Sequence, residues 1–208
     1  MTYKLVAFDM DGTLLTNKSS WWKLHRYFGT YELSLENMKD YQKGKIAYDQ
    51  FMKRDVALWK PRPHINTLKK ILLDYNLVPN AKYVASTLRR KRYHIVLVTT
   101  GLDILANAVA SELHIPHVLA NGLVINKNGY PTRKVIFKVD LLEKEKAFNK
   151  LIAEIGILRN QCIAVGDSKY DVGFLQNAGL GVAFKADIEL RRVANVVIND
   201  LEELLNFV

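Results

Sequence analysis

The sequence predicts an α/β fold in which a parallel sheet is covered by helices on both faces. From residue 79 onward, short β-branched runs alternate with helical stretches of about 10–15 residues, which is typical of such sheets. Between the first strand and that point, residues 19–75 show helical periodicity and no strand pattern. We therefore expect a Rossmann-like core of three layers, with a small helical cap inserted after the first strand.

The first strand covers residues 4–8, which are apolar and partly β-branched, and it leads directly into Asp9-Met10-Asp11-Gly12-Thr13. The helical stretches that follow contain all three tryptophans, and Pro61 and Pro63 interrupt them. We interpret the tryptophans mainly as the core of this small unit. The predicted domains are a cap of residues 16–77 and a core of residues 1–15 and 78–208.

The rest of the chain alternates between the two element types. Strands are expected at residues 94–99, 118–120, 123–125, 135–137, 161–165, 181–184 and 196–198, and helices at 81–91, 103–113, 141–155, 170–178 and the C-terminus. Asn128-Gly129 is a strong turn signal between two short strands, so it predicts a β-hairpin insertion.

Composition limits the class of protein. The 208 residues are 49% hydrophobic and include a single cysteine, which excludes a disulfide scaffold and argues against disorder. No apolar run approaches the ~20 residues of a membrane span, and the single cysteine suits a reducing compartment, so we expect a cytoplasmic protein. We also expect a monomer or a homodimer. A net charge of +9 favours anionic partners without choosing among them. The basic run at residues 89–92 ends a helix, where cations are favoured, so nucleic acid is not the expected partner.

Polar side chains follow several predicted strands. In open parallel sheets, ligands bind at the carboxyl ends of the strands, so these side chains are expected to converge. They are Asp9 and Asp11 after the first strand, Thr99, Thr100 and Gly101 after the second, Asp167 and Asp171 after a later one, and Lys144 or Lys146 on the helix before it.

Clustered carboxylates repel one another, and a hard cation such as Mg²⁺ relieves that repulsion. An added hydroxyl and ammonium suit a ligand with several anionic oxygens, as a phosphoryl group has. Of Asp9 and Asp11, one is suited to attack phosphorus and the other to protonate the leaving oxygen. Gly12 permits a sharp turn beside the ligand. The residues therefore predict chemistry on a phosphoryl group.

These motifs resemble the haloacid dehalogenase superfamily, and within it the phosphoserine phosphatase-like branch, over the whole length of the chain. Residues 48–60 and Ser19-Ser20-Trp21 are similar to an archaeal subgroup of that branch. The resemblance implies an Mg²⁺-dependent hydrolase with an aspartyl-phosphate intermediate. It implies roles for the following residues: Asp9 as nucleophile, Asp11 as general acid and base, Thr99, Thr100 and Gly101 at the phosphate, and Lys144 rather than Lys146 as the motif lysine.

The resemblance also implies a metal site and a substrate site. Mg²⁺ would be held by Asp9, the backbone carbonyl of Asp11 and Asp167, with Asp171 in support. Phosphoserine phosphatases hold serine with a glutamate and an arginine, and those places fall on Lys18 and Asp55 here. The inverted pair predicts one of three outcomes: a reversed grip on a zwitterion, pairing of Lys18 with Asp55 for another substrate, or use of the neighbouring Arg54 as the carboxylate clamp.

Other functions stay open. A phosphatase or phosphotransferase acting on a different small phosphorylated metabolite shares every motif residue with the leading hypothesis. A dehalogenase is disfavoured because it needs neither metal ligands nor Asp11. A non-catalytic binder of phosphorylated ligands or nucleic acid would fit the net charge, but every motif residue is present. A phosphorylation switch is disfavoured because Asp11 would shorten the lifetime of the phosphorylated state.

Overall fold

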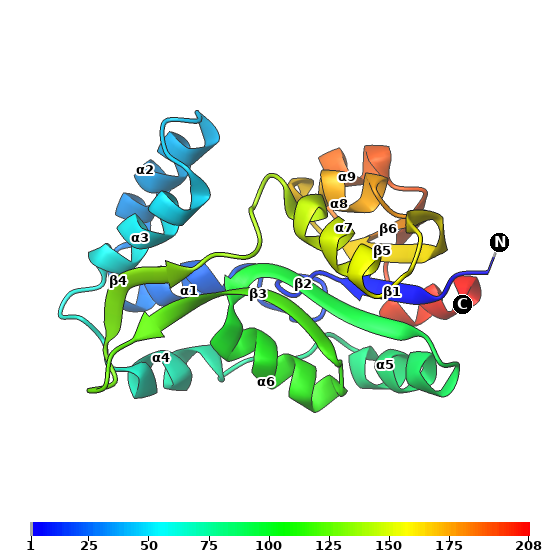
Figure 1. The fold of residues 1–208 in the computed structure, drawn as a ribbon, viewed down its shortest axis with the longest axis horizontal. Helices are drawn as coiled ribbons and strands as arrows, with labels where there is room; N and C mark the ends of the chain where they lie inside the picture. The colour runs from blue at the N-terminus through cyan, green and yellow to red at the C-terminus, as the bar shows by residue number, and fades with distance from the viewer. Residues whose placement is uncertain (1) are drawn as a thin grey trace.

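The computed structural model describes residues 2–208 and is built on one seven-stranded sheet of order β4-β3-β2-β1-β5-β6-β7 (Figure 1). Only the pair β3–β4 is antiparallel; every other neighbouring pair is parallel. The strands are β1 (Leu5–Phe8), β2 (His94–Leu102), β3 (His117–Ile125), β4 (Pro131–Ile136), β5 (Cys162–Gly166), β6 (Leu180–Phe184) and β7 (Val196–Ile198). This confirms the predicted α/β fold with a parallel core sheet.

Alternating side chains of the central strands fill two separate cores. Leu5 and Ala7 of β1 face one core, whereas Val6 and Phe8 face the other. The helices α7 (Lys144–Glu154), α8 (Val172–Gln176) and α9 (Ile188–Val193) cover the first face, and α5 (Ala81–Arg90) and α6 (Asp103–Leu113) cover the second (Figure 1). Since both faces are covered, the strands are almost continuously apolar and ligands are confined to their ends.

Four helices lie between β1 and α5, namely α1 (Ser20–Tyr27), α2 (Tyr31–Gln42), α3 (Tyr48–Leu58) and α4 (Ile65–Leu72). The Ser19 hydroxyl accepts a hydrogen bond from the Trp22 amide at 3.2 Å and so caps α1. Helices α2 and α3 pack together above one end of the sheet, whereas α4 lies beside α6 (Figure 1). The two ends of this region run side by side, because the Val78 amide donates to the Leu14 carbonyl at 2.9 Å. The division at residues 16–77 itself stays a prediction.

The structure differs from the sequence prediction at several elements. The strand expected at residues 135–137 begins earlier, at Pro131, the strand expected at 94–99 continues to Leu102, and the helix expected at 170–178 is shorter, Val172–Gln176. Residues 118–120 and 123–125 belong to one strand, β3, because the buried Asn121 amide bonds to the backbone of Lys138 and Val139 and so does not break the strand. The C-terminal helix is a 3₁₀ helix, η3 (Leu201–Phe207). Helix α7 begins three residues later than expected, since the Leu142 amide is bonded to the Asp140 carboxylate in a turn. Among residues 2–208, no helix combines the length and the apolar character needed to cross a bilayer.

Candidate active site

The turn after β1 brings two carboxylates to the end of the sheet. The Asp9 amide donates to the Val165 carbonyl at 2.9 Å, which extends the β1–β5 pairing by one residue. Gly12 then adopts φ 86°, and a Cβ at this position would lie 2.2 Å from Asp167 Oδ2. Only glycine tolerates both the left-handed backbone and this close approach, so Gly12 permits the contact between the two loops.

Three buried carboxylates meet at this edge. Oxygens of Asp9, Asp167 and Asp171 all lie within 4.8 Å of one another. The Lys144 ammonium, at the start of α7, donates to Asp9 Oδ1 at 2.6 Å and to Asp171 Oδ1 at 2.5 Å. Lys146 is exposed and bonds to Glu143 instead. The structure therefore brings Lys144, and not Lys146, to the carboxylates.

The charges at this cluster do not balance. Burial raises the pKa of Asp9 well above its usual range, and the nearby Lys144 opposes this only in part. Burial likewise raises the pKa of Asp167 to about 6, against the opposing effect of Lys18, whose ammonium donates to Asp167 Oδ2 at 2.5 Å. Burial lowers the pKa of Lys144, but Asp171 and Asp9 together more than reverse this. Three carboxylates facing two ammonium groups, with oxygen donors only, suit a hard divalent cation.

Asp11 lies in a different environment. Its Oδ2 accepts hydrogen bonds from the Ser20 amide at 2.9 Å and from the Ser20 hydroxyl at 2.7 Å. Its Oδ1 is buried and has no hydrogen-bond partner among the residues that the structure describes. Burial raises the pKa of Asp11, in opposition to the Ser20 hydrogen bonds. A carboxyl group with a raised pKa and a free oxygen is suited to giving and taking a proton.

The end of β2 supplies hydroxyl and amide groups. Thr99 is buried, and its hydroxyl oxygen accepts a hydrogen bond from the Gly101 amide at 2.9 Å. Thr99 and Thr100 line the pocket, whereas Gly101 lies behind it. The Thr100 carbonyl accepts a hydrogen bond from Trp21 Nε1 at 3.1 Å, which ties α1 to the strand.

A cavity of about 470 Å³ lies between these groups and the helices α1–α3. The predicted residues on its wall are Asp9, Asp11, Lys18, Asp55, Thr99, Thr100, Lys144 and Asp167; those that the structure places outside the wall are Gly12, Arg54, Gly101 and Asp171. Asp171 lies directly behind, since its Oδ2 accepts from the amides of Asp167 and Ser168 at 3.2 Å each.

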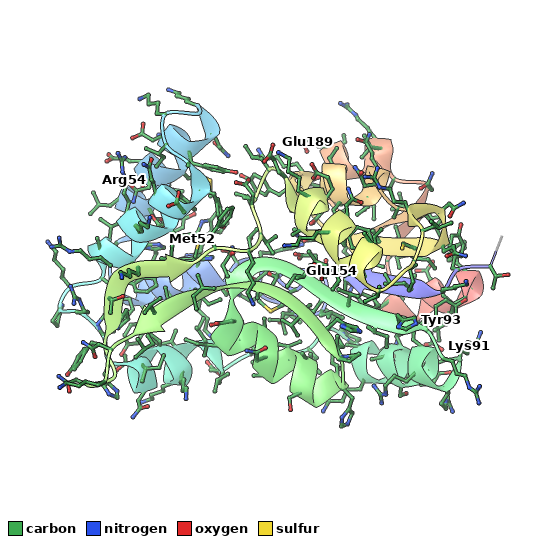
Figure 2. All side chains as sticks on the ribbon, viewed as in Figure 1. Met52, Arg54, Lys91, Tyr93, Glu154 and Glu189 are labelled. Carbon is green, nitrogen blue, oxygen red and sulfur yellow. The ribbon has the colours of Figure 1, made fainter. Side chains whose placement is uncertain are left out.

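The structure bears on two of the three arrangements predicted for the inverted charges, namely a Lys18–Asp55 pair and a clamp formed by Arg54. Lys18 bonds to Asp167, whereas Asp55 is bonded to Asn37 and lies beside His25, so the expected alternative of a Lys18–Asp55 pair is wrong. Arg54 Nη1 donates to the Asp40 carboxylate at 3.0 Å, and Arg54 projects on the outer part of the cap (Figure 2). Successive residues of helix α3 point in different directions, which is why Asp55 lines the cavity and Arg54 does not.

Known proteins resemble this chain in sequence and in fold. The family model of the haloacid dehalogenase-like hydrolases matches residues 3–179. The chain belongs to this family of hydrolases. A phosphoserine phosphatase from Methanocaldococcus jannaschii is 29% identical to this hydrolase in an alignment of 211 positions, which covers 99% of this chain and 97% of the relative. One from Albidiferax ferrireducens is 30% identical, over 98% of this chain and 88% of the relative.

Solved structures of phosphoserine phosphatases have the same fold as this chain. A phospho-aspartyl intermediate analogue of phosphoserine phosphatase has a TM-score of 0.83 and 27% identity, and the match covers 100% of both chains. A substrate-bound phosphoserine phosphatase complex gives 0.83 and 27%, over 100% of this hydrolase and 99% of that chain. The comparisons confirm the predicted phosphoserine phosphatase-like branch and the class of phosphoric monoester hydrolase.

Some residues of the site were missed in the sequence. Ser20 contacts Asp11; the similarity of Ser19-Ser20-Trp21 to the archaeal subgroup pointed to this segment, but no role was predicted for Ser20. Tyr48 and Phe51 of α3 also line the cavity of the hydrolase, and neither was among the predicted site residues. Trp21 does both, since it packs on Trp59 and also faces the cavity. A side chain at the margin of a core carries no sequence mark that distinguishes these roles.

Proposed function

We propose that this hydrolase cleaves small phosphomonoesters through an aspartyl-phosphate on Asp9. The observation that carries the proposal is that Asp9 and Asp11, from one turn, share a single cavity wall with Lys144 and Thr99 from two other elements. A nucleophile, a proton donor, an ammonium and a hydroxyl in one cavity are what phosphoryl transfer requires.

In the first step, an Asp9 oxygen attacks phosphorus while the bond to the ester oxygen breaks. Asp11 gives its proton to that oxygen, so the product leaves as a neutral alcohol. In the second step, Asp11 takes a proton from water, the water oxygen attacks phosphorus, and the bond to Asp9 breaks. Lys144 and the Thr99 hydroxyl hold the phosphoryl oxygens throughout.

We propose Mg²⁺ as the cation of this hydrolase, held by Asp9, the backbone carbonyl of Asp11 and Asp167, with Asp171 in support. The oxygen-only donor set and the uncompensated carboxylates support this assignment. When bound, Mg²⁺ supplies positive charge that lets the phosphate dianion approach the Asp9 carboxylate. We also propose that residues 16–77 act as a cap over the cavity, to which they contribute Trp22 and Phe51.

Hydrolysis of p-nitrophenyl phosphate tests the proposal. We expect turnover that requires Mg²⁺, is lost in EDTA, and is lost in Asp9→Asn while the circular dichroism spectrum is unchanged. An Asp9→Asn protein that retained most of its activity would refute the mechanism. Because the relatives are named phosphoserine phosphatases, phosphoserine is the first natural ester to assay.

A further inference from the structure

The cap side of the cavity is aromatic and contains one acidic group. Its aromatic members are Trp21, Trp22, Tyr48 and Phe51, and the acidic group is Asp55. Aromatic faces attract organic cations, and a carboxylate beside them adds to that attraction. Phosphoryl transfer uses none of these side chains, so they face the part of the substrate that leaves.

Asp55 is held in place by polar neighbours. It is 1% exposed, Asn37 Nδ2 donates to its Oδ1 at 2.8 Å, and His25 Nε2 lies 3.2 Å from its Oδ2. The other ring nitrogen of His25 is 2.8 Å from the Thr30 hydroxyl, which fixes the imidazole. Neither of these neighbours is a lysine or an arginine, and each carboxylate oxygen can accept a second hydrogen bond.

The lysines on the cavity wall contact residues other than Asp55. Among the described residues on its wall, the lysines are Lys18, Lys144 and Lys169. Lys18 and Lys144 bond to the carboxylates below, and the Lys169 ammonium lies 5.5 Å from the centre of the Tyr170 ring. Arg54 is bonded to Asp40. Among the described residues, the side chains that contact the Asp55 carboxylate are Asn37 and His25, and neither a lysine nor an arginine bonds to it. A leaving-group carboxylate placed beside Asp55, as in serine, would therefore meet an acid and no neighbouring lysine or arginine.

We propose that the substrate of this hydrolase is the phosphate ester of an amino alcohol, with a cationic amine and no carboxylate in the leaving group. The inference rests on the proposed function and narrows it. The amine lies against the aromatic faces of the cap and donates to, or is attracted by, the Asp55 carboxylate, while the phosphoryl group lies at Asp9.

Two pairs of esters test the charge preference directly. Phosphocholine is compared with 3,3-dimethylbutyl phosphate, its neutral carbon counterpart, and phosphoethanolamine is compared with phosphoserine. We expect the amine ester to have the higher kcat/KM in each pair by at least about tenfold, as a desolvated cation–π contact of roughly 2 kcal/mol implies. A higher kcat/KM for phosphoserine than for phosphoethanolamine would overturn the inference.

The Asp55→Asn variant tests substrate recognition apart from the chemical step. For each ester, kcat/KM of the variant is divided by kcat/KM of the wild type, so differences in leaving-group reactivity between the esters cancel. We expect kcat/KM for phosphocholine to fall at least about tenfold more than kcat/KM for the neutral ester. An equal loss for both esters would contradict the proposal. Asp40→Asn is the matched control, since it removes an acid of the same cap that lies off the cavity, and it should change neither ester.

The assays distinguish failure of this inference from failure of the proposed function. The circular dichroism spectrum shows whether the Asp55→Asn protein is folded. If it is not, Trp22→Leu serves instead, and its expected result is the same selective loss for phosphocholine. If the wild-type protein hydrolyses no phosphomonoester, p-nitrophenyl phosphate included, the proposed function fails. If it hydrolyses esters without preferring the amine, only the present inference fails.

Discussion

The Lys144 ammonium holds the carboxylate cluster together, so Lys144→Met is the most informative single substitution. The side chain is 3% exposed, and its Nζ lies 2.6 Å from Asp9 Oδ1 and 2.5 Å from Asp171 Oδ1. Methionine preserves most of the volume of the side chain and removes its charge. The variant therefore leaves two buried carboxylates without their shared partner.

Removal of one partner of a buried ion pair costs about 3–5 kcal/mol. We expect the free energy of unfolding of metal-free Lys144→Met to fall by about that amount, measured by urea denaturation at pH 7.5 with EDTA. Adding Asp171→Asn to this variant should restore part of the loss, because one unpaired charge is removed as well. Hydrolysis of p-nitrophenyl phosphate should be lost in both proteins.

Lys146→Met is the matched control on the same helix. Lys146 is exposed and paired with Glu143, so its replacement should change the stability by no more than about 0.5 kcal/mol. Equal destabilisation by Lys144→Met and Lys146→Met would refute the reasoning. So would an Asp171→Asn addition that made the protein less stable still.

Three further outcomes follow from the geometry. Gly12→Ala should lower the stability by at least about 1 kcal/mol and weaken Mg²⁺ binding in calorimetry, since its φ is 86° and the added Cβ would lie 2.2 Å from Asp167 Oδ2; unchanged binding contradicts this. Ser20→Ala should lower kcat about tenfold with little change in KM, because Asp11 loses a hydrogen bond of 2.7 Å. An equal loss in Ser86→Ala, which changes a half-buried serine outside the cavity, would contradict a specific role. Burial raises the pKa of the Cys162 thiol to about 11, so a smaller fraction of it is thiolate at pH 8. A thiol reagent should therefore label Cys162 roughly 100-fold more slowly in the native protein than in urea, and similar labelling rates would contradict this.

The carboxylate cluster at the end of the sheet could be predicted because it depends on local patterns. Alternation along β1 places Val6 and Phe8 in one core and Leu5 and Ala7 in the other, and the strand then ends at Asp9. Since parallel strands end at the same edge, residues from distant segments were expected to meet. The structure brings Asp9, Asp167 and Lys144 together as that argument requires.

The substrate side could not be predicted in the same way. Lys18 and Asp167 are 149 positions apart, and nothing near either residue in the sequence indicates that they pair. The partners of Asp55, Asn37 and His25, come from two other helices whose relative placement depends on packing of the whole cap. Asn121 shows the same limit, because its side chain sustains a strand only through contacts with a later loop.

The site of covalent phosphorylation is the most direct test of the mechanism. The protein is mixed with a phosphomonoester and Mg²⁺, quenched in acid within one turnover and reduced with borohydride, which converts an aspartyl-phosphate to homoserine. Peptide mass spectrometry should then find homoserine in place of Asp9 and nowhere else. The same protein treated with borohydride without the ester should contain no homoserine. Rapid hydrolysis with residue 9 always recovered as aspartate, or with the reduced residue elsewhere, would contradict the account.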